Sequence, residues 1–169
     1  MPKEIINRVA NSKLITIDLE DFYPDGERIV FDISEWLYEG IILKEKDFRE
    51  SVQDHKWSQY KGNYIALTCK TDAIIPSWAY LLITTVLSPY AKKIVVGNLE
   101  LLETLIFQEI ISNLNMNDYI DKPIIIKGCS NKPIPDTASV QLVEKLLPFA
   151  KTILFGEACS TVPLLKKRA

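Results

Sequence analysis

The sequence lacks the features of an exported or membrane-embedded protein. Residues 1–13 carry charges throughout and contain no continuous apolar segment of the kind that a secretory signal needs. No run reaches the roughly 18 apolar residues of a membrane span, since the longest candidate, residues 73–86, is interrupted by Pro76. We therefore expect a cytoplasmic protein that does not associate with membranes.

Basic charge and glycine-rich motifs are also missing. The formal net charge is −2 and the isoelectric point is about 5.5, so there is no basic field to attract nucleic acid. None of the six glycines belongs to a GxGxxG, GxxxxGK[ST] or GxSxG motif, which removes the common signatures of nucleotide-binding proteins and hydrolases. We expect no nucleic-acid partner, and a small molecule is the candidate ligand.

Cysteine and histidine are scarce. The chain has three cysteines and a single histidine, His55. An odd number of cysteines in a reducing compartment favours free thiols or metal ligands over disulfides. No CxxC or HxxxH pair supplies the usual chelating spacing.

What the chain does contain is a regular alternation of strands and helices. Apolar runs predict strands near 64–68, 93–96, 123–127 and 152–155, and helical periodicity predicts helices at 77–87, 99–114 and 136–147. This alternation predicts an α/β fold with a mainly parallel sheet, right-handed crossovers and helices on both faces. The preceding part is expected to add a strand pair, 14–19 with 28–33, and short helices at 3–10, 34–40 and 45–54.

An internal repeat is visible in the second part of the chain. Residues 76–97 align with residues 135–156 without a gap, and eight of the 22 positions are identical. We interpret the chain as one domain, 1–169, with an N-terminal elaboration at 1–62 and a duplicated strand-helix-strand unit, 63–114 and 122–169. Convergence of two such units on the same proline and glycine positions is the alternative reading.

The repeat places each cysteine just after a predicted strand. In open parallel sheets, ligands bind in the crevice outside the carboxyl ends of the strands. We therefore expect the cysteines to converge there, and the candidate binding residues are Cys69, Asp72, Cys129, Ser130, Cys159 and Ser160. A zinc ion held by Cys69, Cys129, Cys159 and His55 is one hypothesis. A single reactive thiol and three separately packed cysteines are the others.

Several segments resemble a known protein family. The chain resembles a family of small bacterial proteins catalogued as a domain of unknown function, in segments DLEDFYP (18–24), KEKDFRE (44–50), DAIIPSWAY (72–80), KGCS (127–130) and GEACSTVP (156–163). The resemblance implies a compact bacterial protein and assigns no chemistry and no site residues.

Three functions are compatible with these patterns. The first is a noncatalytic α/β domain that binds a ligand in a cysteine-lined pocket. The second is a thiol-dependent or metal-dependent enzyme that acts on a small molecule. The third is a structural or interaction protein that forms a homodimer through the helix at 77–87, which is apolar nearly all round.

Overall fold

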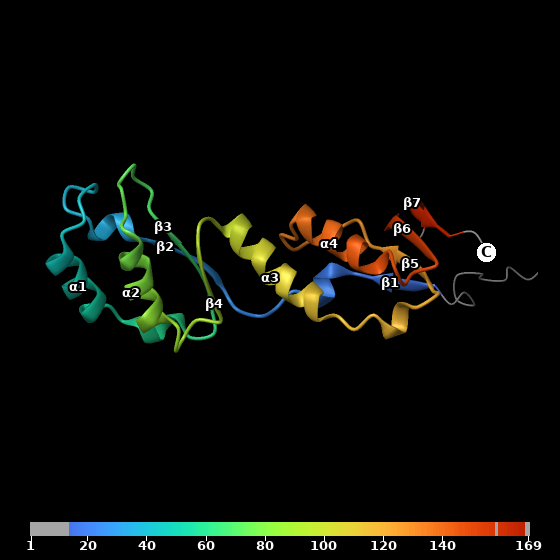
Figure 1. Ribbon diagram of the computed structural model, residues 1–169, viewed down its shortest axis with the longest axis horizontal. Helices are drawn as coiled ribbons and strands as arrows, with labels where there is room; N and C mark the ends of the chain where they lie inside the picture. Colours follow the sequence, from blue (N-terminus) through green and yellow to red (C-terminus); the bar gives the residue numbers. More distant parts are fainter. Residues whose placement is uncertain (1–13, 158, 168–169) are drawn as a thin grey trace, which may run out of the picture. The chain divides into compact units, whose positions relative to one another are not determined.

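The chain forms two compact units (Figure 1). The computed structural model describes residues 14–157 and 159–167. Unit 1 comprises Met1–Tyr23 together with Phe107–Ala169, and unit 2 comprises Pro24–Ile106. Unit 2 is therefore inserted, in chain order, between the two segments of unit 1. The second boundary falls within helix α3 (Leu99–Asn113).

A three-stranded parallel sheet lies at the centre of unit 2. Its strands are β2 (Arg28–Asp32), β3 (Tyr64–Thr68) and β4 (Lys93–Val96), in that order, so β2 lies at an edge. Parallel neighbours require long crossovers between them. Those crossovers contain η2 (Ile33–Trp36), α1 (Glu45–Asp54), η3 (Trp57–Tyr60) and α2 (Ser77–Leu87).

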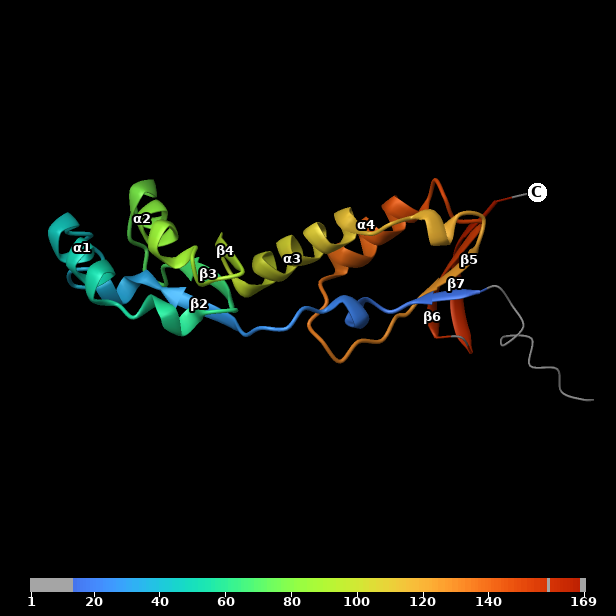
Figure 2. The same cartoon turned by 90° about the horizontal axis from the view of Figure 1, so that it is seen from below.

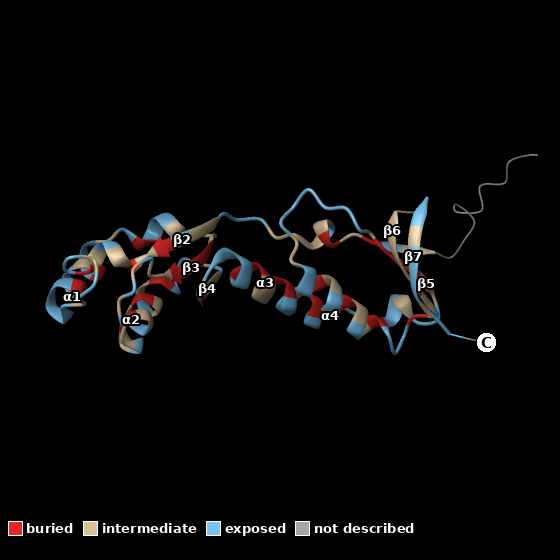
Figure 3. Cartoon of the chain, turned by 90° about the horizontal axis from the view of Figure 1, so that it is seen from above, coloured by how far each residue is buried: buried red, intermediate tan, exposed pale blue. Residues whose placement is uncertain are grey.

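Helices α1 and α2 bury one face of the unit 2 sheet (Figure 3). Phe48 of α1 and Ile83 of α2 are fully buried in this core, together with Ile65 and Leu67 of β3. Residues 64–67 of β3 are all buried, on both faces, which explains why this strand is apolar throughout instead of alternating.

Unit 1 contains a four-stranded mixed sheet. The strands are β1 (Ile15–Ile17), β5 (Pro123–Ile126), β6 (Thr152–Glu157) and β7 (Ser160–Lys166), in that order, with β7 antiparallel to β6. Helix α4 (Asp136–Leu146) lies on one side of this sheet (Figure 2). Its Leu142 and Leu146 pack with Phe107 and Ile111 of α3 in a buried core. The unit also contains the short helices η1 (Leu19–Phe22) and η4 (Asn117–Tyr119).

Equivalent prolines mark both ends of α2 and α4. Pro76 and Pro135 are the N-cap residues, with φ values of −67° and −70°. Ser77 and Asp136 are therefore the first helical residues. Each helix ends next to a further proline, which cannot continue a helix.

The α/β class and the predicted strands and helices between residues 45 and 157 are confirmed, whereas the sequence did not predict β7, and two predictions about pairing are wrong. The parallel strands form two sheets and not one. The segments at 14–19 and 28–33 do not form a hairpin, because β1 pairs with β5 and β2 pairs with β3. Apolar periodicity shows which side of a strand is buried, and it does not show which strand lies beside it.

Further predictions concern the repeat, the short helices and the homodimer. Both units contain a strand, a short helix, a strand, a helix and a strand in this order, but α1 and η3 interrupt the series in unit 2, and unit 1 adds α3, η4 and β7. Duplication therefore stays a prediction, and the unit boundaries differ from the repeat limits proposed above. The predicted helix at 34–40 is only the single turn η2, and the one at 3–10 lies outside the described residues.

Helix α2 leaves Leu81 64% exposed, so a homodimer through this helix also stays a prediction. In the described part of the chain, no helix has the length and apolarity to cross a membrane.

Candidate functional site

The three cysteines do not share a sheet edge. Cys69 follows β3 in unit 2, whereas Cys129 and Cys159 follow β5 and β6 in unit 1. The common edge on which their predicted convergence rested therefore does not exist. Among residues 14–157 and 159–167, no group of three or more His, Cys, Asp or Glu side chains is arranged to hold a metal ion. The zinc hypothesis, with His55 as a fourth ligand, thus has no support in the structure.

The individual cysteines occupy different environments. Cys69 is half-buried against the unit 2 core, and its Sγ lies 3.4 Å from Thr71 Oγ1. Cys129 and Cys159 are exposed. These two cysteines follow the neighbouring strands β5 and β6. The chain segments after the two strands approach each other closely, since a Cβ added to Gly128 would lie 3.2 Å from Gly156 Cα. The other predicted binding residues, Asp72, Ser130 and Ser160, are all exposed.

Asp32 at the end of β2 organises a site that the sequence analysis missed. Its Oδ1 accepts hydrogen bonds from the backbone N–H of Ser34, at 3.0 Å, and of Lys70, at 3.2 Å. The Lys70 ammonium lies 3.5 Å from Oδ2. Burial acts to raise the pKa of Asp32, but the hydrogen bonds from Ser34 and Lys70 and the Lys70 charge outweigh it and lower the pKa. Asp32 is therefore a fixed carboxylate at neutral pH.

His55 stands beside this carboxylate in a group of aromatic rings. Both Gln59 Nε2, at 3.1 Å, and Tyr60 Oη, at 2.9 Å, contact His55 Nε2. An amide nitrogen can only donate, so His55 Nε2 is the acceptor and the ring proton resides on Nδ1. Burial lowers the pKa of His55 and raises that of Tyr60. Both side chains are consequently uncharged at neutral pH.

These groups line one cleft, which we name the Asp32 cleft. It has a volume of about 240 Å³, and its walls include Asp32, Glu35, Trp36, His55, Tyr60 and Lys70. The rings of Trp36 and His55 lie 5.4 Å apart between centroids, and those of His55 and Tyr60 are stacked at 5.6 Å. Cys69 is not one of the wall residues, although it precedes Lys70 in the chain.

A second, acidic hollow shares two walls with the Asp32 cleft. It has a volume of about 490 Å³ and is lined by Trp36, Asp47, Glu50, Ser51, Asp54 and His55. Its three carboxylates come from one face of α1, where residues three and four positions apart are neighbours. Trp36 and His55 thus separate two acidic depressions on unit 2.

Unit 1 has an aspartate in the matching position. Asp18 follows β1, accepts a hydrogen bond from the Glu20 N–H at 3.0 Å and pairs with Lys127, 2.6 Å away at the end of β5. Burial tends to raise its pKa, yet the hydrogen bonds from Lys127 and Glu20 lower it overall. The segments ITID (15–18) and IVFD (29–32) each place an aspartate at the carboxyl end of a strand, and this shared pattern is the signal that would have found both residues.

Comparison with known proteins identifies a family and nothing closer. A family model described as "Protein of unknown function (DUF2480)" matches residues 3–167. No curated protein and no solved structure matches the chain. The match spans all five segments that resemble a family of unknown function, so that resemblance is confirmed.

Proposed function

The chain belongs to the family DUF2480, proteins of unknown function, and we propose that this member reversibly binds a small organic ammonium ion in the Asp32 cleft. The observation that carries the proposal is the wall of that cleft, which combines two carboxylates with aromatic rings and a neutral imidazole. This site differs from the cysteine-lined pocket that the sequence predicted, because no cysteine lines the Asp32 cleft.

The charge balance of the cleft favours a cation. Asp32 and Glu35 contribute two negative charges, and Lys70 contributes one positive charge. His55 adds none, because burial keeps its imidazole neutral. An ammonium group beside Trp36 would also gain from the negative face of the indole ring, whereas an anion would meet net repulsion.

The position and size of the cleft indicate a small ligand. The cleft lies at the carboxyl end of an edge strand, a usual location of ligand sites in parallel sheets. Its volume of about 240 Å³ is below the roughly 300 Å³ at which drug-sized sites begin. The neighbouring hollow adds Asp47, Glu50 and Asp54, whose combined field would draw cations towards Trp36 and His55.

Lys70 occupies the place that a ligand ammonium ion would take. Its side chain is 71% exposed, and its Nζ lies 3.5 Å from an Asp32 carboxylate that is only 10% exposed. An exposed lysine held by one loose ion pair moves at little energetic cost. A ligand ammonium can therefore replace the Lys70 ammonium without leaving Asp32 uncompensated.

The test compares a cation with its neutral isostere. We expect choline to shift the backbone amide NMR signals of Trp36, His55 and Tyr60, while 3,3-dimethyl-1-butanol, which has the same shape without the charge, leaves them unchanged. Equal shifts with the two compounds would show that charge plays no part and would overturn the proposal.

A matched pair of variants locates the binding. Glu35→Gln removes a wall charge and should weaken choline binding roughly three- to tenfold, the effect of one nearby charge at a partly hydrated site. Glu39→Gln makes the same chemical change at an exposed residue outside the cleft wall and should leave the affinity as it is. Equal losses in both variants would place the ammonium ion somewhere other than the Asp32 cleft.

A further inference from the structure

The loop after β5 encloses a carboxylate of its own chain. Ser130 Oγ donates to Glu20 Oε1 at 2.9 Å, and the N–H of Lys132 donates to the same oxygen at 3.0 Å. The N–H of Asn131 also donates to Glu20 Oε1. Three donors from consecutive residues thus converge on one oxygen.

This arrangement is an anion-binding nest. Successive backbone N–H groups that point into one concavity bind phosphate and carboxylate oxygens in many proteins. The Ser130 hydroxyl also lies 2.9 Å from the Lys132 carbonyl oxygen, so its single proton is shared between that oxygen and Glu20 Oε1. The donors of the loop are therefore already oriented for an oxyanion and need little rearrangement to accept one.

The group that occupies the nest in this structure is the Glu20 side chain, which can move out of it. Glu20 lies in the short helix η1, more than a hundred residues away in sequence from the loop. Residues 128–133 are exposed, so water can take over the hydrogen bonds on either side when the two separate. The three donors lower the pKa of Glu20, with the Ser130 bond as the largest cause, so Glu20 enters the nest as a carboxylate.

The two units differ at this point. In unit 2 the equivalent loop amide, of Lys70, donates to Asp32, the aspartate that also caps the short helix. In unit 1 that aspartate, Asp18, pairs with Lys127 instead. The loop of unit 1 donates to Glu20 and not to this aspartate.

We propose that the Ser130–Lys132 loop is a binding site for a phosphate or carboxylate anion and that Glu20 closes it until such an anion takes its place. Lys132 belongs to the nest, and Lys127, although paired with Asp18, interacts electrostatically with the Glu20 carboxylate that fills the nest, so both lysines supply positive charge that suits an anion. The site lies in unit 1 and does not depend on the ammonium site of unit 2.

The test removes the Glu20 carboxylate from the nest by substitution, in the 169-residue chain. Sodium phosphate and sodium acetate are titrated at constant ionic strength while the amide NMR signals of Asn131 and Lys132 are followed. Glu20→Ala should bind phosphate at least tenfold more tightly than the wild-type chain. Asp21→Ala removes the same charge from the same short helix without touching the nest, and it should behave like wild type.

Two further variants complete the experiment. Ser130→Ala in the Glu20→Ala chain should reverse most of the gain, because it removes one donor. Glu20→Gln, which keeps the length of the side chain, should give an intermediate gain and serves if Glu20→Ala does not fold. Binding of phosphate alone, or of phosphate and acetate, supports the proposal and identifies the anion. Equal affinities in the Glu20 and Asp21 variants, or binding of neither anion, would overturn it.

Discussion

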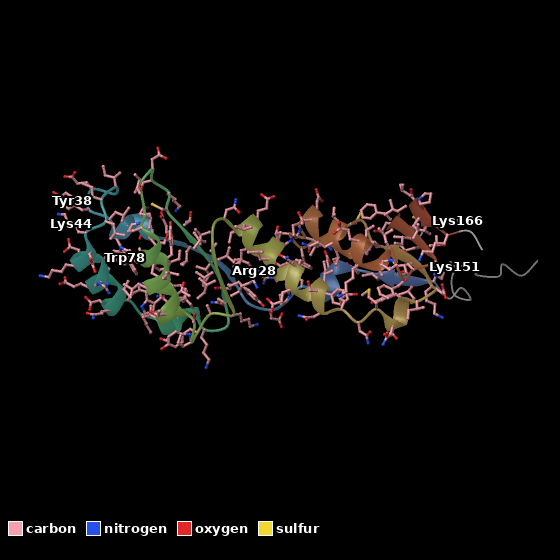
Figure 4. All side chains as sticks on the ribbon, viewed as in Figure 1. Arg28, Tyr38, Lys44, Trp78, Lys151 and Lys166 are labelled. Carbon is pink, nitrogen blue, oxygen red and sulfur yellow. The ribbon has the colours of Figure 1, made fainter. Side chains whose placement is uncertain are left out.

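Arg28, labelled in Figure 4, forms a buried ion pair with Glu103. The distance from Arg28 Nε to Glu103 Oε1 is 2.6 Å, and only 11% and 6% of the two side chains are exposed. The pair connects the first residue of β2 to helix α3. Arg28 Nη1 also donates to the carbonyl oxygens of Pro24 and Gly26, at 2.8 and 2.6 Å. The arginine therefore holds the turn before β2 as well as the face of the sheet opposite α2.

We predict that Glu103→Ala strongly destabilises unit 2. Removal of one partner leaves a buried guanidinium without its counter-charge, which costs about 3–5 kcal/mol of unfolding free energy. Urea unfolding followed by tryptophan fluorescence measures this loss, since all three tryptophans, at 36, 57 and 78, lie in unit 2. The control is Glu100→Ala, an exposed glutamate of the same helix, which should change the free energy little. Similar losses in both variants would contradict the prediction.

Gly26 is expected to tolerate no side chain. Its φ is +125°, and a Cβ there would overlap the carbonyl oxygen of Gly62. Gly26→Ala should therefore lower the unfolding free energy by about 3 kcal/mol, from strain and collision together. Gly62→Ala is the matched control, because its φ is +80° but no atom lies within 4 Å of the added Cβ. It should lose only about 1 kcal/mol, and a larger loss for Gly62→Ala would refute the argument.

His55 should make stability depend on pH below neutrality. Burial lowers the pKa of His55 beneath its ordinary value of 6.5, so below pH 6.5 the unfolded chain binds a proton that the folded chain does not. Stability must then fall as the pH drops from 6.5 towards the folded-state pKa. Melting temperatures between pH 7.5 and 5 should decline, and His55→Asn should flatten that decline. An unchanged slope in the variant would exclude His55, the sole histidine, as the cause.

The carboxylates titrate in a separate, more acidic range. The pKa values of Asp18, Glu20 and Asp32 are all lowered in the folded chain, from ordinary values of 3.8, 4.5 and 3.8. Their contribution to stability is complete above those values and is lost as the pH falls through the folded-state values. Most of the decline between pH 6.5 and 5 can therefore be assigned to the histidine.

The cysteines should differ in reactivity towards a thiol reagent. Cys129 and Cys159 are exposed, whereas Cys69 is half-buried with its Sγ against Thr71. Reaction with Ellman's reagent should show two fast thiols and one slow thiol in the folded chain, since access controls the rate. Cys69→Ala should remove the slow phase alone. Three equal rates would mean that the unit 2 core does not protect Cys69.

Element positions could be predicted from this sequence because the strands are short apolar runs bounded by proline and glycine. Pro76 and Pro89 enclose α2, and Gly97 follows β4, so the local chain contains the information. The pairing of β1 with β5 could not be predicted in the same way. Strand partners are chosen by tertiary packing, and a short alternating segment is compatible with several neighbours.

The candidate site was missed for a related reason. The sequence predicts that Asp32 lies in a strand pair, 14–19 with 28–33, where an aspartate indicates no particular function. The cysteines, in contrast, are possible metal ligands and nucleophiles. Only the parallel pairing of β2 with β3 brings Asp32 beside Lys70, and only the turn after α1 brings His55 to the same cleft. Such convergence depends on contacts between segments that are distant in sequence, which spacing alone does not reveal.

The insertion of unit 2 has a consequence for synthesis. Asp18 and Lys127, whose pairing joins the ends of β1 and β5, lie 109 residues apart. A ribosome that adds roughly 5–20 residues per second needs about 5–20 s to cover that distance. During this interval β1 has emerged without its partner, while all three strands of unit 2 have already been made. The nascent chain should therefore fold from its middle outward, and its earliest strand waits longest for a neighbour.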